Sequence, residues 1–453
     1  MLGEFIKKEV AAFEVFNPDA KKLIIINLIY ALAFPFIIIF GSAFIIRVTD
    51  GNNTMAIIYN WGFFLGLIVG YFINGKLLKN KFDIRKIFTI GIFLTVIPLS
   101  LLMFFGKDAG YLVIFYGLAV GAGNGIYWSC RNFVTYLVTN EENRNFFASI
   151  EQFIIIFCNA LIPLLFGTFI LGSNPDQEFK MTAYKYTSVV VVIITMLAGI
   201  LILKSNFKTP QIKKFVYFKF GKIWNYQRFL TFTVGMVEAG FMVLMTLLIL
   251  NIAGDESVLG KIEFSTAIVS VISIYIVGRI AKPQHRGKIM LAGAICLIIG
   301  GTVLAFTITN NNMMFDFLAV SFLGVIVMKI GQVIADPMVH SSFRATFLSS
   351  IEKATRDEKK ESYSFIMDNE YFMNGGRIFG GVVFLLLTYY IDDIGALRYT
   401  FIILALIQLV SAFIVGKLAK MGQTAGNIEP EFTEIPAVIP EIDTPRDKDP
   451  DVI

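Results

Sequence analysis

Blocks of roughly 20 consecutive apolar residues recur along this chain and constrain its fold more than any other feature. A block of that length crosses a hydrocarbon core of about 30 Å as an α-helix. Because a bilayer offers the backbone no hydrogen-bonding partner, only helices and closed barrels can span it. Barrel strands alternate apolar and polar residues, and runs such as 23–46 and 188–203 do not. The sequence therefore predicts an all-α membrane protein.

About twelve membrane-spanning helices are predicted, in two sets of six. They are expected over 23–46, 54–75, 87–106, 110–137, 146–172 and 182–203, and then over 229–253, 258–280, 288–309, 313–339, 363–388 and 396–419. The expected domains are an N-terminal six-helix bundle (1–203), a basic cytoplasmic linker (204–228), a C-terminal six-helix bundle (229–420) and a tail (421–453). The tail is acidic and rich in Pro, without apolar periodicity, and is predicted to be a disordered cytoplasmic segment.

Lys and Arg are distributed unequally between alternate loops. One set of loops is rich in them, notably 76–86, 204–222, 279–288 and 344–360, and the opposite set is nearly free of them. Because basic residues favour the cytoplasmic side, this pattern predicts a multi-pass protein of the cytoplasmic (inner) membrane with both termini in the cytoplasm.

Residues that bind metals or catalyse reactions are scarce. The chain has three cysteines, Cys130, Cys158 and Cys296, and two histidines, His285 and His340, without metal-ligand spacing. It has no Walker A pattern for binding ATP. We therefore expect no metal, no cofactor, no catalytic residues and no nucleic-acid partner. A membrane-embedded transferase is a weak alternative, since neither histidine has an obvious catalytic partner.

The two halves of the chain share spacings that indicate an internal repeat. The basic loops 75–86 and 278–288 match when Gly91 is aligned with Gly293, and segment 141–149 matches 356–364 in a register that places Asn159 on Asn374. Two six-helix halves in the same orientation, joined by a linker, form a parallel repeat of a kind found in secondary transporters.

The first of these loops resembles the signature of the major facilitator superfamily, Gly-x-Leu-x-Asp-Arg-x-Gly-Arg-Arg. The matching positions are Leu78, Asn80, Lys81, Phe82, Arg85 and Lys86. Asn80 replaces the Asp that gating contacts use in the family, and Asp83 replaces a Gly. Residues 127–132 with 143–144 also resemble a poorly characterised bacterial group of facilitators. The resemblance implies two pseudo-symmetric six-helix bundles and transport by alternating access.

Two opposite charges are expected to pair near the cytoplasmic ends of consecutive helices. Arg131 and Glu151 each lie roughly 8–9 Å from the predicted end of their helix, at about 1.5 Å per residue. An ion pair at this depth would act as a structural contact or a gate latch.

Deeper charges are candidates for binding the substrate or an ion, because ionisable residues inside membranes usually face a cavity or one another. They are Glu238, Lys329, Glu370 and Arg377. The resemblance places Glu238 and Lys329 on cavity-lining helices. Glu238 could carry a coupling proton, with its pKa set by burial and by Lys329 or the substrate. Alternatively, Lys329 and Arg377 could bind an anionic substrate, or all four could only hold helices together.

Several uncharged features complete the predictions. Asn124, Tyr127 and Trp128 could line a polar cavity and stack on a sugar, or act as interfacial anchors. Pro35 and Pro163 predict kinks. Glycines at four-residue intervals (62, 66 and 70; 117, 121 and 125) predict close helix packing. Segment 340–360 is predicted to be an amphipathic helix on the cytoplasmic surface.

The sequence thus favours secondary transport of a small solute, a sugar or an organic anion, with a proton or another cation as the candidate coupling ion. The predicted partners are this solute and membrane lipid, and the protein is expected to be a monomer. The main alternative is a transporter-like sensor whose acidic tail transmits the signal.

Overall fold

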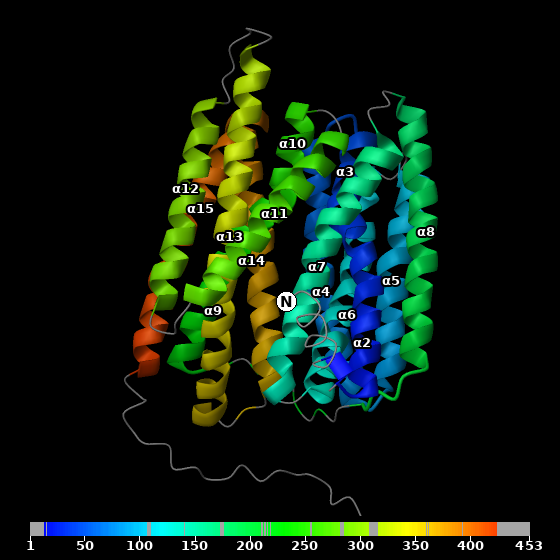
Figure 1. Cartoon of the computed structure of the whole chain (residues 1–453), viewed down its shortest axis with the longest axis vertical. Coiled ribbons are helices and arrows are strands. Elements are labelled where there is room, and N and C mark those ends of the chain that lie inside the picture. Colours follow the sequence, from blue (N-terminus) through cyan, green and yellow to red (C-terminus); the bar gives the residue numbers. More distant parts are fainter. Residues whose placement is uncertain are drawn as a thin grey trace, which may run out of the picture.

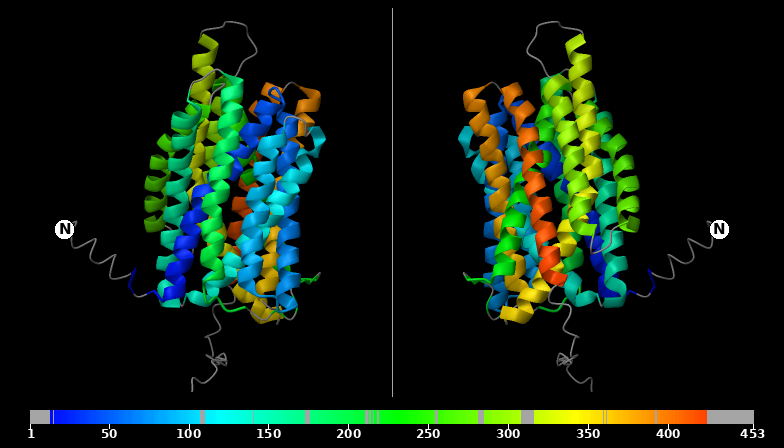
Figure 2. Two further views of the ribbon diagram at one scale, coloured as in Figure 1. Left: turned by 90° about the vertical axis from the view of Figure 1, so that its right-hand side faces the viewer. Right: turned by 90° about the vertical axis from the view of Figure 1, so that its left-hand side faces the viewer.

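The computed structural model describes residues 13–423, except 15, 107–109, 140, 173–175, 210, 211, 213, 215, 218, 254, 255, 281–284, 308–315, 359, 361 and 392. The predicted tail therefore lies outside the described residues. All regular secondary structure in the described part is helical. The helices run roughly along one common axis (Figures 1 and 2).

The N-terminal half contains six helical spans. Their elements are α2 (Pro18–Pro35), η1 (Phe36–Phe40) and α3 (Gly41–Val48), which form one span, then α4 (Asn53–Lys79), α5 (Ile84–Phe105), η3 (Gly110–Leu112) with α6 (Val113–Val138), α7 (Glu141–Leu164) with η4 (Leu165–Leu171), and α8 (Gln177–Leu203).

The C-terminal half repeats this arrangement. Its elements are α9 (Lys222–Ala239), η5 (Gly240–Leu244) and α10 (Met245–Ala253), which form one span, then α11 (Glu256–Ile280), α12 (Arg286–Thr307), α13 (Asp316–Glu358), α14 (Ser362–Tyr390) and α15 (Asp393–Gln423).

The number of membrane spans agrees with the prediction of about twelve. Among the described residues, 11 helices are long and apolar enough to cross a membrane, and a shorter apolar stretch, Phe153–Thr168, belongs to α7 and η4. The N-terminal end of α2, the C-terminal end of α15 and the segment joining α8 to α9 lie at the lower end of the bundle in Figure 1. We call this the basic end, because it carries the basic loops, and we call the other the opposite end.

The two halves pack their helices in the same way. The pairs α2–α7, α2–α8, α4–α6, α5–α6 and α5–α8 recur as α9–α14, α9–α15, α11–α13, α12–α13 and α12–α15. The halves meet through α4 with α14 and through α7 with α11, which is again a symmetric pair of contacts. The two six-helix bundles expected from the repeat are therefore present.

The predicted glycine stripes form the contact between α4 and α6. A Cβ atom placed on Gly62, Gly66, Gly70, Gly117, Gly121 or Gly125 would come within 2.0–2.4 Å of a backbone oxygen of the facing helix. Because no side chain fits in that space, glycine is what lets the two backbones approach.

The kinks expected at Pro35 and Pro163 take the form of π-helical segments. η1 follows Pro35, η4 begins two residues after Pro163, and η5 stands in the seventh span without a proline. A proline removes a backbone donor from the helix, and a π segment re-forms the hydrogen-bonding pattern with a wider turn.

Two predicted boundaries are wrong. Residues 340–360 do not form a separate surface helix, because α13 continues without a break from Asp316 to Glu358, through Pro337. Similarly, α9 begins at Lys222 rather than at 229. Both helices extend through polar residues beyond the apolar block, and hydropathy marks the apolar block rather than the helix.

Candidate functional site

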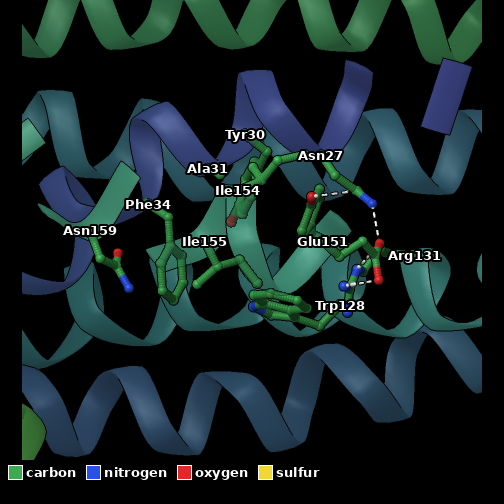
Figure 3. A pocket seen from close by; sticks show the side chains of 11 residues that line it. Asn27, Tyr30, Ala31, Phe34, Trp128, Arg131, Glu151, Ile154, Ile155 and Asn159 are labelled. Carbon is green, nitrogen blue, oxygen red and sulfur yellow. Dashed lines mark hydrogen bonds and ion pairs between the residues drawn. The ribbon is translucent and has the colours of Figure 1, made fainter. Parts of the chain in front are cut away.

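A pocket lies within the N-terminal half, between α2, α6 and α7 (Figure 3). We call it the aromatic pocket. Its lining residues are Asn27, Tyr30, Ala31, Phe34, Tyr127, Trp128, Arg131, Glu151, Ile154, Ile155 and Asn159. Two of the predicted uncharged residues, Tyr127 and Trp128, therefore line it. The third, Asn124, does not, and both polar atoms of its buried amide lack hydrogen-bonding partners among the described residues.

One end of the aromatic pocket is closed by a network of charged and polar groups. Arg131 forms an ion pair with Glu151 at 2.5 Å, as the matched depths predict. Asn27 donates a hydrogen bond from Nδ2 to Glu151 Oε1, and its Oδ1 accepts one from the Tyr127 hydroxyl at 3.1 Å. The Glu151 side chain is 8% exposed. Because Arg131 neutralises this carboxylate locally, the end of the pocket carries polarity without net charge.

Four aromatic rings line the aromatic pocket, beside aliphatic side chains. Tyr30 stacks on Tyr127 with centroids 3.5 Å apart, and Phe34 meets Trp128 edge to face at 5.8 Å. The Arg131 guanidinium lies 4.8 Å from the Trp128 ring centroid. Flat apolar faces beside a few fixed polar groups are typical of small-molecule sites.

Arg377 and Glu238 form the main pair in the C-terminal half. Arg377 on α14 donates to Glu238 on α9 and to Asn374 Oδ1, both at 2.8 Å. The carboxylate of Glu370, two turns before Arg377, forms no hydrogen bond or ion pair within the described part of the chain. It lies within electrostatic range of Arg377, Glu238 and Arg344.

Lys329 does not pair with Glu238, although the sequence analysis allowed that partnership. Its ammonium bonds to Glu263 on α11 at 2.7 Å and is 7% exposed. Sequence reasoning missed Glu263, and also missed that Asp368 accepts from Arg228 and Trp224. The signal that could have found Glu263 is that it is an acidic residue inside a predicted membrane span, 258–280.

A buried cluster joins the two halves at the opposite end, and we call it the Glu256 latch. Glu256 on α11 is 1% exposed and pairs with Lys180 of α8 at 3.1 Å and with Arg47 of α3, whose Nε lies 2.7 Å away. The Tyr184 hydroxyl also donates to it, at 3.5 Å. Two cations of one half thus converge on one carboxylate of the other.

Further contacts join the halves near the latch and towards the basic end. Near the latch, Asn53 of α4 donates to Asp393 at 3.2 Å and accepts from Asn251 at 3.0 Å. Towards the basic end, the hydroxyls of Tyr363 on α14 and Ser129 on α6 lie 3.4 Å apart, and Tyr363 packs on Phe133. This hydrogen bond joins the halves through two neutral groups.

The signature loop forms a tight turn between α4 and α5. Leu78 is buried, Asn80 caps the end of α4, and Lys81 adopts a left-handed φ of 61°. Asp83 caps α5 by accepting from the Arg85 backbone at 2.9 Å and pairs with its side chain at 2.7 Å. These hydrogen bonds from Arg85 lower the pKa of Asp83. Lys86, the last residue of the match, lies in the first turn of α5.

These features define a multi-pass membrane protein built from two six-helix halves with polar groups in its interior. Among the described residues, no group of three or more His, Cys, Asp or Glu side chains could hold a metal ion. The profile of the Major Facilitator Superfamily matches residues 23–351. The chain belongs to that superfamily, whose members are transporters.

Similar proteins agree with this assignment. YqgE of Bacillus subtilis (strain 168), an uncharacterised protein, is 24% identical over 369 residues, which cover 76% of this chain and 80% of YqgE. Among solved structures, a D-xylose-proton symporter superposes with a TM-score of 0.65 at 13% identity, over 88% of this chain and 97% of that one. The inward-open xylose transporter XylE from E. coli gives 0.61 at 15% identity, over 88% and 96%. These similarities show a shared fold.

Proposed function

We propose that this protein carries a small neutral solute across the cytoplasmic membrane by alternating access, as a monomer with both termini in the cytoplasm. The division predicted from sequence, an N-terminal bundle (1–203), a linker, a C-terminal bundle and a tail, is part of this proposal, with the linker ending before Lys222, where α9 begins, instead of at 228. The observation that carries it is the distribution of buried ion pairs. Arg131–Glu151, Arg377–Glu238 and Lys329–Glu263 each lie within one half, whereas the pairs of Glu256 join the halves at one end.

This distribution suits two halves that rock as units. Separating a buried charge from its partner costs about 3–5 kcal/mol. Pairs within a half stay intact when the halves tilt, so the interior charges do not oppose the movement. Contacts at the ends of the bundle break and re-form, which is what gates must do.

A neutral solute is favoured over an organic anion by the ion pairs of three interior basic residues. Lys329, Arg377 and Arg131 each have a carboxylate partner. An anion would have to displace that partner, leaving a buried carboxylate uncompensated. The rings of the aromatic pocket suit the apolar face of a sugar, and Asn159 and the Asn27 network offer polar contacts at its ends.

Glu370 is the proposed coupling carboxylate, ahead of Glu238. Glu238 is occupied by Arg377, whereas Glu370 has no ion-pair partner among the described residues. The charged and titratable groups in its electrostatic range are Arg377 on its own helix, Glu238 on α9, Arg344 on α13 and Tyr71 on α4. A carboxylate that no ion pair holds can take up and release a proton without leaving a cation unpaired.

Uptake into proteoliposomes tests transport and coupling together. Purified protein is reconstituted and uptake of radiolabelled neutral monosaccharides is measured with and without a pH gradient. We expect accumulation driven by the gradient. Absence of uptake for neutral sugars, with uptake of carboxylates instead, would contradict the proposed solute class; ligand binding without any flux would favour the sensor.

Two variants separate coupling from binding. Glu370→Gln should abolish accumulation driven by the pH gradient and preserve exchange of labelled for unlabelled solute. Glu352→Gln removes an exposed carboxylate from the last turns of α13 and should change neither. Gradient-driven accumulation that survives in Glu370→Gln would show that another group carries the proton.

A further inference from the structure

The segment that joins α8 to α9 lies at the basic end (Figure 1) and is rich in lysine. From residue 204 to the first residue of α9, 222, it contains six lysines and no Asp or Glu. We call its exposed, described lysines the lysine strip: Lys204, Lys208, Lys214, Lys219 and Lys222. Like charges so close along the chain repel one another, so a partner with negative charge would stabilise this segment.

The lysine strip is held against both halves of the protein. Near its start, the Thr209 hydroxyl accepts a hydrogen bond from the Ile84 backbone N–H of α5 at 3.1 Å. At its end, the Gly221 N–H donates to Glu358 of α13 at 2.8 Å. Because α5 belongs to the N-terminal half and α13 to the C-terminal half, a partner bound along the strip covers a surface that both halves share. An anchored surface also loses less conformational freedom on binding than a free loop does.

Carboxylates near the lysine strip have other cations as partners. They form the ion pairs Asp83–Arg85, Glu358–Lys360 and Asp368–Arg228. None of the five lysines of the strip forms an ion pair within the described residues. The positive charge of the strip is therefore available to a partner from outside this part of the chain.

The chain itself contains a segment of opposite charge. Residues 424–453, which we call the acidic tail, have eight acidic residues and two basic ones. Exposed charges of opposite sign attract one another over the Debye length, about 8 Å at physiological ionic strength. Each such contact is weak by itself, so stable binding needs several acidic residues and several lysines. The acidic tail and the lysine strip provide both.

The acidic tail begins beside the end of the lysine strip, because it directly follows α15. The Lys417 ammonium of α15 lies 4.4 Å from the ring centroid of Tyr226, in the second turn of α9. Lys353 of α13 donates to the Met421 carbonyl, near the end of α15, at 2.8 Å. The last turns of α15 thus contact α9 and α13, the two helices that hold the end of the strip.

We propose that the acidic tail binds the lysine strip and covers the segment that joins the two halves. The proposal does not depend on the transported solute or on transport itself. Binding within one chain is favoured, because a flexible tether gives an effective concentration of about millimolar. It should weaken in high salt, since the Debye length falls to about 3 Å at 1 M. An anionic bilayer surface would compete for the same lysines.

Acylation of lysines followed by mass spectrometry tests the proposal in the full chain, held in nanodiscs of phosphatidylcholine, which has no net charge. The comparison is a variant with Glu→Gln and Asp→Asn at all eight acidic positions of the acidic tail. The lysine strip should react at least about threefold faster in this variant, because a partner at millimolar effective concentration fills most of a site of submillimolar affinity. Three reference lysines, exposed elsewhere at the basic end, should react equally fast in both proteins: Lys76, Lys79 and Lys288. In 1 M salt the difference at the lysine strip should disappear.

Substitutions in the lysine strip provide the reverse test. Lys208→Gln, Lys214→Gln and Lys219→Gln together should release the acidic tail, and a glutamate-specific protease should then cleave the tail at least about threefold faster. The matched control replaces the three reference lysines by Gln. It removes the same charge from the same end and should leave the cleavage rate unchanged. Because all six lysines are exposed, neither triple variant should impair folding.

Equal acylation of the lysine strip with either tail overturns the proposal. So does protection that extends equally to the reference lysines, because it would show attraction to the basic end as a whole. If the strip is protected only after phosphatidylglycerol is added, and equally with either tail, its partner is an anionic bilayer surface and the proposal falls. The transport proposal is decided separately, by uptake into proteoliposomes.

Discussion

Removing the charge of Glu256 should open the end of the bundle that it closes. In Glu256→Gln, Arg47 and Lys180, whose side chains are 13% and 5% exposed, lose their ion pairs with Glu256. Breaking a buried pair by removing one partner costs about 3–5 kcal/mol. The two cations escape this cost when the halves separate at that end and water reaches them. At about 1.4 kcal/mol per factor of ten, the open population should rise between roughly one hundred and a few thousand times.

Labelling of a buried thiol measures this population. Ser42 on α3 is 1% exposed and accepts a hydrogen bond from Asn60, so Ser42→Cys is a small change behind the Glu256 latch. In a background in which the three native cysteines are replaced, a membrane-impermeant maleimide should label this thiol slowly. Adding Glu256→Gln should accelerate labelling in proportion to the open population.

Glu263→Gln is the matched control. It removes a carboxylate from the same helix and deprives Lys329 of its partner, but within one half. Glu263→Gln should destabilise the protein about as much as Glu256→Gln does. The rate at which the Ser42→Cys thiol is labelled should stay at the rate measured without either change. If the two variants label Ser42→Cys equally fast, the change reflects general loosening of the protein, and our interpretation of Glu256 as a latch between the halves is wrong.

Four further substitutions test the packing and the signature loop through thermal unfolding. Gly66→Ala would place a Cβ 2.2 Å from a backbone oxygen of α6 and should destabilise the protein by at least about 2 kcal/mol, whereas Gly416→Ala meets nothing within 4 Å and should gain up to about 1 kcal/mol. Lys81→Gly should stabilise the loop by up to about 1 kcal/mol, since its φ of 61° favours glycine. Asp83→Asn should lose the stabilisation from Arg85 at neutral pH. Arg85 lowers the pKa of Asp83. The difference in stability between the unchanged protein and Asp83→Asn should therefore persist down to about pH 5 and vanish as the pH falls through the lowered pKa.

The sequence predicts the helices and their packing well, because both depend on patterns that are local in the chain. Apolar length determines the spans, and glycines at a spacing of four determine which faces of α4 and α6 meet. The pair Arg131–Glu151 is predictable for a similar reason. The two residues lie on consecutive helices at the same depth, so few other partners are available.

The partners of deeper charges are not predictable in this way. The depth of a residue in the membrane follows from counting residues along its helix. The direction in which its side chain points depends on how that helix is rotated about its axis. Lys329 and Glu238 have similar depths, and yet α13 turns Lys329 towards Glu263 on α11. The π segments add to the difficulty, since each changes the rotation of all residues that follow it. Asn27, which precedes η1, donates a hydrogen bond to Glu151. Because Asn27 is uncharged, the search for charged residues inside the membrane spans did not identify it as a partner of Glu151.

The two ends of the bundle differ in what it takes to open them. Towards the basic end, a hydrogen bond between the neutral hydroxyls of Tyr363 and Ser129 joins the halves, worth about 0.5–1.5 kcal/mol. At the opposite end, Arg47 and Lys180 must leave Glu256 and be hydrated, at about 3–5 kcal/mol if the carboxylate stays buried. Without solute, the interior should therefore open more often towards the basic end. To complete the cycle, a solute that binds both halves must offset this difference in the free energy of opening the two ends. Glu256→Gln should make that difference smaller.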